Sequence, residues 1–227
     1  MIVAIIPAGG SSSRYKTSSN ANQSKLFEPI HNTPVIEHSI NAFIKLENIH
    51  HVIVSCQKND KEKLDALATK HNKKLSVTIG GKTRAESVLN AFKLIPTSCS
   101  KVLIHDAARP NPSPNLIQTV IESLNNHPVI IPAIPITDTI KKVNGETIDK
   151  TLDRTHLRGA QTPQGFNYNT LSNAYKTNNN FESFTDESSL LESIGINGQI
   201  IPGELENIKV TIPLDLTILS TLMTYPV

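Results

Sequence analysis

Length, composition and charge exclude several classes of protein. The chain has 227 residues, of which 38% are apolar and 19% charged, as in folded globular proteins rather than disordered ones. Lys and Arg number 22 against 20 Asp and Glu, and the resulting net charge of +2 supplies no overall basic field for nucleic acid. Four Tyr, six Phe and no Trp argue against a platform that stacks single-stranded bases. We expect one domain over residues 1–227.

Cysteine content and apolar segments predict a cytoplasmic protein with no membrane anchor. Cys56 and Cys99 are too few for a disulfide framework and suit a reducing compartment. The apolar start, from Met1 to Pro7, is too short for a signal peptide and lacks a basic flank. The run from Val129 to Ile136 contains two prolines and is too short to cross a bilayer.

Short apolar runs alternate with segments of helical periodicity along most of the chain. The runs that predict strands are residues 2–7, 52–55, 77–79, 102–104 and 129–133. They are continuous rather than alternating, as expected of parallel strands buried on both faces. Helical patterns follow Pro34 and Pro114, and Thr83 to Glu86 has the form of a capping box that opens another helix. This order predicts an α/β fold with a mostly parallel, twisted sheet flanked by helices, which binds ligands beyond the carboxyl ends of its strands.

One segment interrupts this rhythm. Residues 139–143 and 146–150 flank Asn144-Gly145, a strong signal for a β-hairpin. Because the segment has too few apolar residues to bury both faces, we expect it to project as an arm at about residues 137–156. An isolated hairpin is at best marginally stable in water, and exchange of arms in a homodimer would give it a partner surface.

The first candidate binding motif, residues 7–14, directly follows the first predicted strand. Its paired glycines, Gly9 and Gly10, let backbone N–H groups approach a phosphate, and Arg14 can donate two hydrogen bonds to phosphate oxygens. The motif is neither G-x-G-x-x-G nor a Walker P-loop. The alternative interpretation is a glycine-rich turn with a solvated arginine.

The second motif, residues 105–110, follows the predicted strand 102–104. A carboxylate at the carboxyl end of a strand, here Asp106, suits Mg²⁺, which takes oxygen ligands and bridges substrate phosphates. Alternatively, Asp106 caps the following turn and pairs with Arg109. We expect His105 to pack or form hydrogen bonds rather than bind metal, since no second His or Cys stands at ligand spacing.

The third motif, residues 80–87, again brings together a strand end, glycines and a helix start. Helix N-termini offer unpaired N–H groups to an anion or a base edge. A capping box accounts for Thr83 and Glu86 but not for Arg84, a cation where the helix dipole disfavours one. Three strand ends that each carry glycines or a carboxylate plus an arginine predict a pocket for a nucleoside triphosphate with a metal ion.

Further candidates are scattered along the chain: Thr139, Arg154, Thr162, Thr185 and Lys209. Singly each is unremarkable, and Thr185 has an alternative role as the cap of a helix that ends at Gly195. No Ser-His-Asp constellation or reactive-cysteine context competes with the triphosphate pocket.

Taken in order, these motifs resemble the 2-C-methyl-D-erythritol 4-phosphate cytidylyltransferase family from Val3 to about Leu216. The resemblance rests on P-A-G-G-S-S-S-R, G-G-K-T-R-A-E-S-V, H-D-A-A-R-P, I-T-D-T-I-K, L-D-R, Q-T-P-Q-G-F, T-D-E-S-S and N-I-K-V-T. It implies a single nucleotidyltransferase domain with a Rossmann-like α/β fold, and a homodimer with an exchanged β-arm. It also implies that CTP and the polyol phosphate form a CDP-linked alcohol and pyrophosphate with Mg²⁺, in non-mevalonate isoprenoid synthesis.

The resemblance also implies residue roles. Catalytic roles fall on Arg14, Lys25, Arg154 and Lys209. Nucleotide-binding roles fall on Ala8, Gly9, Gly10, Gly81, Lys82, Arg84, Ser87 and Asp106, of which Asp106 would also bind the metal. Substrate-binding roles fall on Asp106, Ala107, Arg109, Thr139, Arg154, Thr162, Thr185 and Lys209.

Three features of the chain depart from the family pattern or limit what it implies. The stretch from Arg14 to Lys25 is longer than usual, and Ser24 and Leu26 replace the customary Pro and Gln, so Lys16 competes with Lys25 as the second loop cation. Lys82 stands where the family often has an acidic residue, which favours recognition of cytosine there by the backbone. The chain ends soon after the N-I-K motif, so we expect no fused cyclodiphosphate synthase.

Two other functions stay open from the residues alone. A ribitol 5-phosphate cytidylyltransferase would share the fold and the CTP pocket, and its acceptor also presents a phosphate and hydroxyls. A non-catalytic nucleotide-binding module would keep the fold without the reaction, although the joint presence of Arg14, Asp106, Arg154 and Lys209 argues against it.

Overall fold

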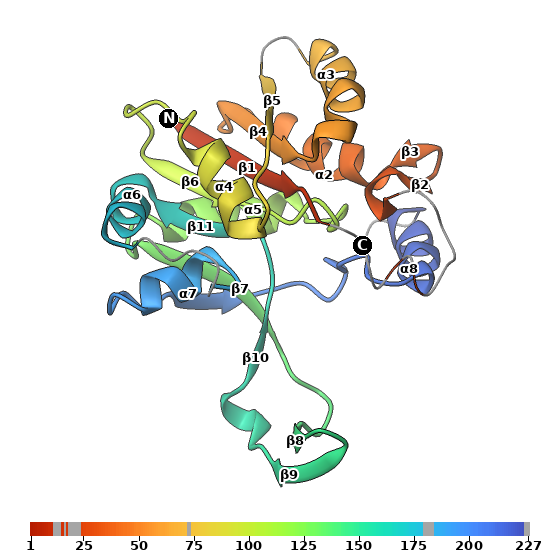
Figure 1. Ribbon diagram of the computed structural model, residues 1–227, viewed down its shortest axis with the longest axis vertical. Coiled ribbons are helices and arrows are strands. Elements are labelled where there is room, and N and C mark those ends of the chain that lie inside the picture. Colours follow the sequence, from red (N-terminus) through yellow and green to blue (C-terminus); the bar gives the residue numbers. More distant parts are fainter. Residues whose placement is uncertain (11–14, 16, 18–23, 72–73, 179–183, 225–227) are drawn as a thin grey trace.

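A central sheet with helices on both faces forms the body of the protein, and a long arm extends from it (Figure 1). The computed structural model describes residues 1–10, 15, 17, 24–71, 74–178 and 184–224. Within those residues the main sheet has eight strands in the order β10-β7-β11-β6-β1-β4-β5, with β12 also paired to β7. The predicted mostly parallel α/β fold is confirmed.

The strands of the main sheet are β1 (Ile2–Ala8), β4 (His51–Cys56), β5 (Leu75–Ile79), β6 (Lys101–Ile104), β7 (Val129–Pro135), β10 (Arg158–Ala160), β11 (Gln164–Asn167) and β12 (Gln199–Pro202). The five apolar runs of the sequence correspond to β1, β4, β5, β6 and β7. Parallel pairing joins β6 to β1, β1 to β4 and β4 to β5. The short strands β10 and β11 run antiparallel to their neighbours, and no apolar run in the sequence predicts them.

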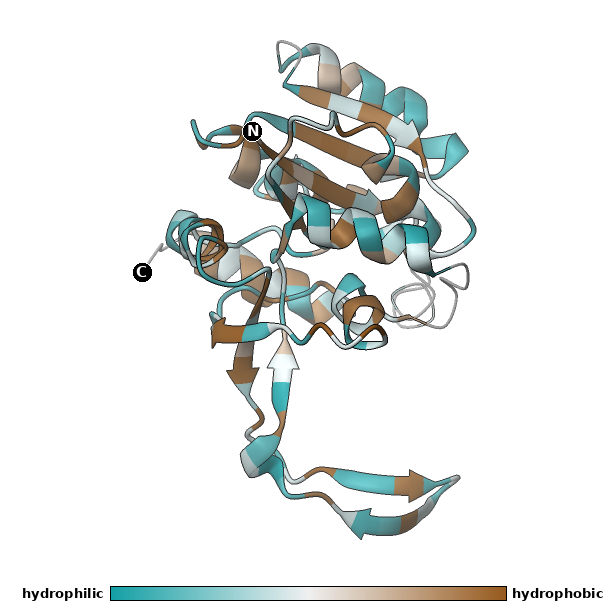
Figure 2. Ribbon diagram, turned by 90° about the vertical axis from the view of Figure 1, so that its left-hand side faces the viewer, coloured by the Kyte–Doolittle hydropathy of each residue, from teal (hydrophilic) through white to brown (hydrophobic). Residues whose placement is uncertain are grey.

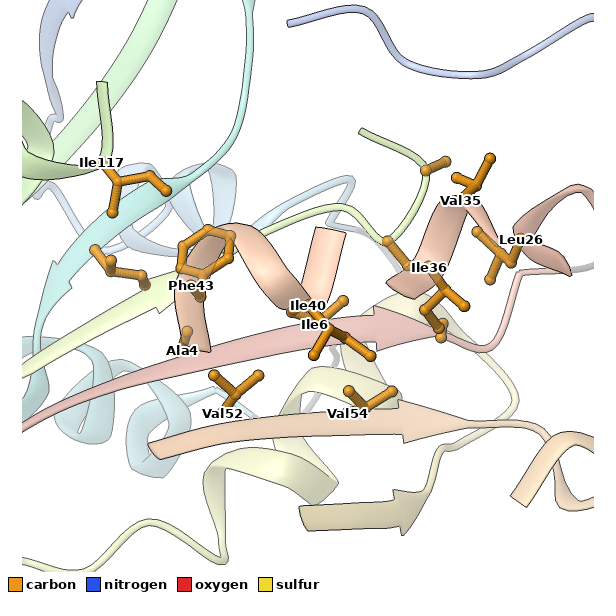
Figure 3. Close-up of a cluster of buried hydrophobic side chains, with 14 of the residues drawn as sticks. Ala4, Ile6, Leu26, Val35, Ile36, Ile40, Phe43, Val52, Val54 and Ile117 are labelled. Carbon is orange, nitrogen blue, oxygen red and sulfur yellow. The ribbon is translucent and has the colours of Figure 1, made fainter. Parts of the chain in front are cut away.

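Strand β1 is buried on both faces because its alternate side chains enter two different cores. Ala4 and Ile6 point into one apolar cluster, with Ile40 and Phe43 of a helix on that face (Figure 3). The intervening β1 residues, Val3 and Ile5, belong to the second cluster on the opposite face. Because both faces of β1 are covered by apolar side chains, apolar residues are favoured at every position of the strand and not only at alternate ones. This explains its continuous apolar sequence.

The helices divide between these two faces. The first cluster includes side chains of α2 (Val35–Ile44), α3 (Lys61–Thr69), α5 (Pro114–Ser123) and α8 (Pro213–Thr224). The second includes side chains of α4 (Arg84–Phe92), α6 (Tyr168–Thr177) and α7 (Glu187–Glu192). The remaining short elements are η1 (Lys25–Phe27), β2 (Pro29–Ile30), β3 (Thr33–Pro34), η2 (Lys58–Asp60) and η3 (Arg154–His156). No helix within the described ranges is long and apolar enough to span a membrane.

The predicted hairpin stands clear of the body as an arm between β7 and β10 (Figure 2). Its strands are β8 (Lys141–Asn144) and β9 (Thr147–Thr151), which pair only with each other in a separate sheet. All their residues are exposed. The turn glycine, Gly145, has a φ of 59°, a conformation that favours glycine. The strands begin later than predicted. Thr139 precedes them, in the segment that leads from β7 into the arm.

Candidate active site

A cavity of about 460 Å³ opens where β1 and β6 end and α4 begins. Open parallel sheets bind ligands at this edge. Ten of the residues that the sequence predicts for the site line the cavity: Ala8, Gly9, Gly10, Lys25, Lys82, Arg84, Ser87, Asp106, Ala107 and Lys209. Tyr15, Gln57 and Thr83 also line it and carry no predicted role. Most of the predicted nucleotide-binding residues therefore lie together in this cavity. Their roles stay predictions.

Two glycine loops meet at the side chain of Ser87, on one side of the cavity. Ser87 Oγ accepts a hydrogen bond from Gly81 N at 3.0 Å and donates one to Thr83 O at 2.8 Å. A Cβ at Gly80 would lie only 2.6 Å from Ser87 Oγ, and one at Gly9 would lie 3.2 Å from it. The glycines are thus needed for the close approach of β1 and α4, and Ser87 holds that junction.

The predicted capping box is present only in part. Thr83 Oγ1 accepts a hydrogen bond from Glu86 N at 3.1 Å, as expected of an N-cap. The Glu86 carboxylate accepts its bond from Lys82 N at 2.6 Å, instead of from the Thr83 backbone. Glu86 therefore fixes the loop that carries Lys82, one of the residues that line the cavity.

Asp106 lies at the centre of a group of three cations. Its Oδ2 is 2.7 Å from Lys209 Nζ and 3.7 Å from Arg109 Nε, and its Oδ1 is 3.6 Å from Arg84 Nε. Burial, which leaves only 13% of its side chain exposed, opposes ionisation, but the charges of Lys209 and Arg84 outweigh it and hold the pKa of Asp106 well below its usual range. The alternative pairing with Arg109 is therefore real, and it coexists with a place for Asp106 in the cavity wall.

Arg84 has a second partner that the sequence analysis missed. Arg84 Nη1 donates a hydrogen bond to Glu187 Oε2 at 2.9 Å, and only 2% of the Glu187 side chain is exposed. Burial raises the pKa of Glu187, and the positive charge of Arg84 offsets part of that rise. The position of Arg84 in the first turn of α4 was the available signal, because an unfavourable cation there predicts an acidic partner elsewhere.

Behind Asp106, His105 and Thr162 form a buried hydrogen-bonded pair. Thr162 Oγ1 accepts a bond from Asp106 N at 3.0 Å and contacts His105 Nδ1 at 3.1 Å. His105 Nε2 contacts Arg109 O at 2.8 Å, and burial lowers the pKa of His105 to about 4. The Thr162 hydroxyl thus fixes the turn that carries Asp106 and Arg109. It does not line the cavity, and its predicted contact with substrate stays a prediction.

The other predicted residues lie apart from the cavity. Arg109 lies beside it, with its Nε in the ion pair with Asp106. Arg154 is exposed in η3, where the arm returns to the body, and its Nη1 donates to Thr137 O. Thr139 is exposed in the segment that leads from β7 into the arm. Thr185 is exposed just before α7, whose N-cap is Asp186 rather than Thr185. Arg14, and Lys16 as the alternative to Lys25, fall outside the described residues.

Among the described residues, the site combines a glycine-lined strand end, a buried carboxylate, three lysines and one arginine in one cavity. That combination on an open α/β sheet defines the class of nucleotidyltransferases, which bind a nucleoside triphosphate and stabilise its charge. The sequence model of the family "IspD: 2-C-methyl-D-erythritol 4-phosphate cytidylyltransferase" matches residues 2–225. The chain therefore belongs to that family.

Curated relatives support the assignment over nearly the whole chain. The 2-C-methyl-D-erythritol 4-phosphate cytidylyltransferase of Clostridioides difficile is 35% identical over 222 residues, which cover 96% of this chain and 92% of that protein. The "Bifunctional enzyme IspD/IspF" of Desulfotalea psychrophila is 38% identical over 213 residues, which cover 93% of this chain. This chain spans about half (54%) of the length of that bifunctional relative.

Solved structures agree with this placement. A crystal structure of the Francisella tularensis 2-C-methyl-D-erythritol 4-phosphate cytidylyltransferase is 30% identical and superposes with a TM-score of 0.81, over 96% of this chain and 97% of that one. A second structure, from Anaerococcus prevotii, has a TM-score of 0.83 over 99% of both chains at 24% identity, and it supports the fold.

We predict that Thr162→Val destabilises the protein, while Thr162→Ser does not. Valine keeps the shape but removes the hydroxyl, so Asp106 N and His105 Nδ1 lose a buried partner, at a cost of about 1–3 kcal/mol in the free energy of unfolding. Serine retains the hydroxyl and is the matched control. Urea unfolding compares the two variants. Equal stabilities would show that the Thr162 hydroxyl does not hold the Asp106 turn.

Proposed function

We propose that the protein transfers the cytidylyl group of CTP to 2-C-methyl-D-erythritol 4-phosphate, in the non-mevalonate synthesis of isoprenoid precursors. An oxygen of the acceptor phosphate attacks the α-phosphorus of CTP, the bond between the α- and β-phosphates breaks, and pyrophosphate leaves. The observation that carries the proposal is the cavity at the ends of β1 and β6, where the glycine loops face Lys25, Lys209 and Arg84. Membership of the family supplies the identity of both substrates.

The chemistry needs charge stabilisation rather than a general base. The acceptor phosphate is already anionic, so the barrier comes from bringing two highly charged anions together. Lys25 and Lys209 line the cavity, and we assign them, with Arg14, to the charge of the triphosphate and the acceptor phosphate. One pair of unit charges at 4 Å is worth about 4 kcal/mol at an effective dielectric of 20, which makes each cation important.

Recognition of cytosine falls to the glycine loops. We assign the base to Ala8 and Gly9, which line the cavity, and to the neighbouring Gly81, whose N–H donates to Ser87 Oγ. Gln57 Nε2 donates to Gly9 O at 2.9 Å, which steadies the β1 loop from the end of β4.

Release of pyrophosphate from CTP tests the proposal directly. We expect release with 2-C-methyl-D-erythritol 4-phosphate and little or none with ribitol 5-phosphate, because the chain belongs to the first enzyme's family. A preference for ribitol 5-phosphate would reassign the acceptor. No release with either acceptor would contradict the proposal and favour a binding module.

We propose Asp106 as the protein ligand of a divalent cation, because a carboxylate oxygen at this edge of the sheet is the type of ligand that Mg²⁺ takes. Oδ2 of Asp106 is held by Lys209, while Oδ1 lies 3.6 Å from Arg84 Nε, beyond hydrogen-bonding distance. Within the described residues no three His, Cys, Asp or Glu side chains come together, so the phosphates must supply most of the ligands, as Mg²⁺ commonly requires. When bound, Mg²⁺ would neutralise phosphate charge during transfer.

We predict that Asp106→Asn raises the Mg²⁺ concentration needed for half-maximal activity at least several-fold. The amide keeps an oxygen but loses the charge that attracts the cation. A Mg²⁺ titration of pyrophosphate release measures the shift, and the same titration with Asp138→Asn, an exposed residue near the foot of the arm, is the control. An unchanged titration for Asp106→Asn would remove it from the metal site.

We further propose a homodimer in which the arm of one chain completes the acceptor site of the other. Arg154 and Thr139 flank the arm on its two feet, and both are exposed rather than turned into their own cavity. On the arm, Val143 and Ile148 are 54% and 59% exposed, which is unfavourable unless another surface covers them. Arg154 and Thr139 are thus placed to bring a cation and a hydroxyl to the acceptor phosphate bound by a partner chain.

Complementation between two inactive variants tests the shared site. If the arm acts in trans, a heterodimer of Lys209→Ala and Arg154→Ala carries both lesions in one site and none in the other. It should recover about half the wild-type activity per heterodimer, by site counting. If the arm acts in its own chain, every site keeps one lesion, and a verified heterodimer without activity would contradict the exchange.

The state of the cysteines supports a cytoplasmic location. Cys56 and Cys99 are both buried and free, and burial raises the pKa of Cys56 to about 11, which keeps the thiol protonated and unreactive. Free thiols of this kind suit a reducing compartment.

A further inference from the structure

The buried carboxylate of Glu187 has no role in the proposed reaction. It lies behind Arg84, which lines the cavity and donates a hydrogen bond to it. It belongs to the first turn of α7, and Leu190 and Leu191 of the same helix enter the second apolar cluster. An ionised group is kept at such a position only when it is paired. Its partner is Arg84, 103 residues earlier in the chain.

Arg84 joins Glu187 to Asp106. Its Nη1 binds Glu187 Oε2 at 2.9 Å, while its Nε faces Asp106 Oδ1 at 3.6 Å. The pKa of Arg84 is lowered by burial but raised further by Glu187 and Asp106, so the guanidinium stays charged. The shorter and better-formed contact is the one to Glu187, outside the cavity wall.

We propose that Glu187 neutralises Arg84 and thereby makes it a positioning residue for Asp106 rather than a cation for the phosphates of CTP. The inference rests on the proposed function, in that it takes CTP as the ligand of the cavity. It goes beyond that function because it removes Arg84, which lines the cavity, from the charges offered to the triphosphate. Of the described cavity residues, Lys25 and Lys209 are then the cations that we assign to phosphate.

The surroundings of the pair agree with this role. The N-cap of α7, Asp186, is held by Gln164 Nε2 at 2.7 Å, so the helix start that carries Glu187 is anchored to β11. The direct hydrogen bond from Arg84 to Glu187 and the anchored helix start leave the guanidinium little freedom to turn toward a ligand. A phosphate-binding arginine would instead direct its paired Nη groups at the ligand.

The proposal predicts the sign of an affinity change. Glu187→Gln keeps the shape and a hydrogen-bond acceptor but removes the negative charge, so Arg84 gains an uncompensated positive charge beside the cavity. We expect CTP, measured by calorimetry without acceptor, to bind about fivefold tighter at low salt, with the gain shrinking as ionic strength rises. Glu122→Gln, on the exposed last turn of α5, removes the same charge elsewhere and should leave CTP affinity unchanged.

A double variant separates neutralisation from direct binding. Arg84→Gln/Glu187→Gln removes both charges together, and we expect it to bind CTP more weakly than Glu187→Gln, with a loss of less than tenfold from the wild type that reflects the lost contact of Arg84 with Asp106. If Arg84 itself held a phosphate, the double variant would bind CTP at least tenfold more weakly. This comparison stands even where the single Glu187→Gln variant fails to fold, which thermal unfolding of each variant establishes.

The outcomes distinguish this inference from the proposed function. A wild-type protein that binds CTP and releases pyrophosphate, together with a folded Glu187→Gln variant of unchanged or weaker CTP affinity, would overturn the inference alone. A double variant with a tenfold loss would do the same. A wild type that does not bind CTP would overturn the proposed function and this inference with it. Tighter, salt-sensitive binding by Glu187→Gln and a loss of less than tenfold in the double variant would support it.

Discussion

The site depends on one buried carboxylate, that of Asp106, and on the cations arranged around it. Lys209, Arg109 and Arg84 come from three separate stretches of the chain, and each contacts Asp106. Without the carboxylate, three like charges would repel one another across a few ångströms. Asp106 is therefore the group that allows a cationic pocket to exist before the triphosphate arrives, and that pre-organisation is what charge stabilisation in catalysis requires.

A second layer of contacts holds this arrangement in place. Thr162 and His105 fix the backbone on either side of Asp106, and Glu187 holds Arg84 from outside the cavity. Removal of one partner of a buried ion pair typically costs about 3–5 kcal/mol, because the other charge is left uncompensated. The carboxylates of Asp106 and Glu187 offset two of the three charges of Arg84, Arg109 and Lys209, which leaves one net positive charge. Lys25 adds a second positive charge in the cavity wall.

Local sequence patterns predicted the frame of the site well. The apolar runs gave β1, β4, β5, β6 and β7, because strands buried on both faces need apolar residues at every position. Since the carboxyl ends of parallel strands share one edge, the predicted motifs at Gly9 and Asp106 had to meet. Asn144-Gly145 likewise predicted the arm, whose geometry is set by its own turn.

Contacts between distant parts of the chain could not be predicted in this way. Glu187 pairs with Arg84 across 103 residues, and the pattern T-D-E around it indicated a helix start rather than an ion pair. The hydroxyl of Thr162 contacts Asp106 N and His105 Nδ1, two partners that no local pattern around Thr162 indicates. In both cases the partner is set by the packing of helices and strands onto the sheet, which leaves no periodic signal in the sequence.

A crystal structure of the protein with CTP would test the central claim, that this cavity is a pre-organised triphosphate site. We expect cytosine against Gly9, Gly81 and Ser87, phosphates against Gly10 and Lys25, and Asp106 still bonded to Lys209, with Arg84 still on Glu187. CTP bound away from the ends of β1 and β6, or phosphates held by an Arg84 that has left Glu187, would contradict it.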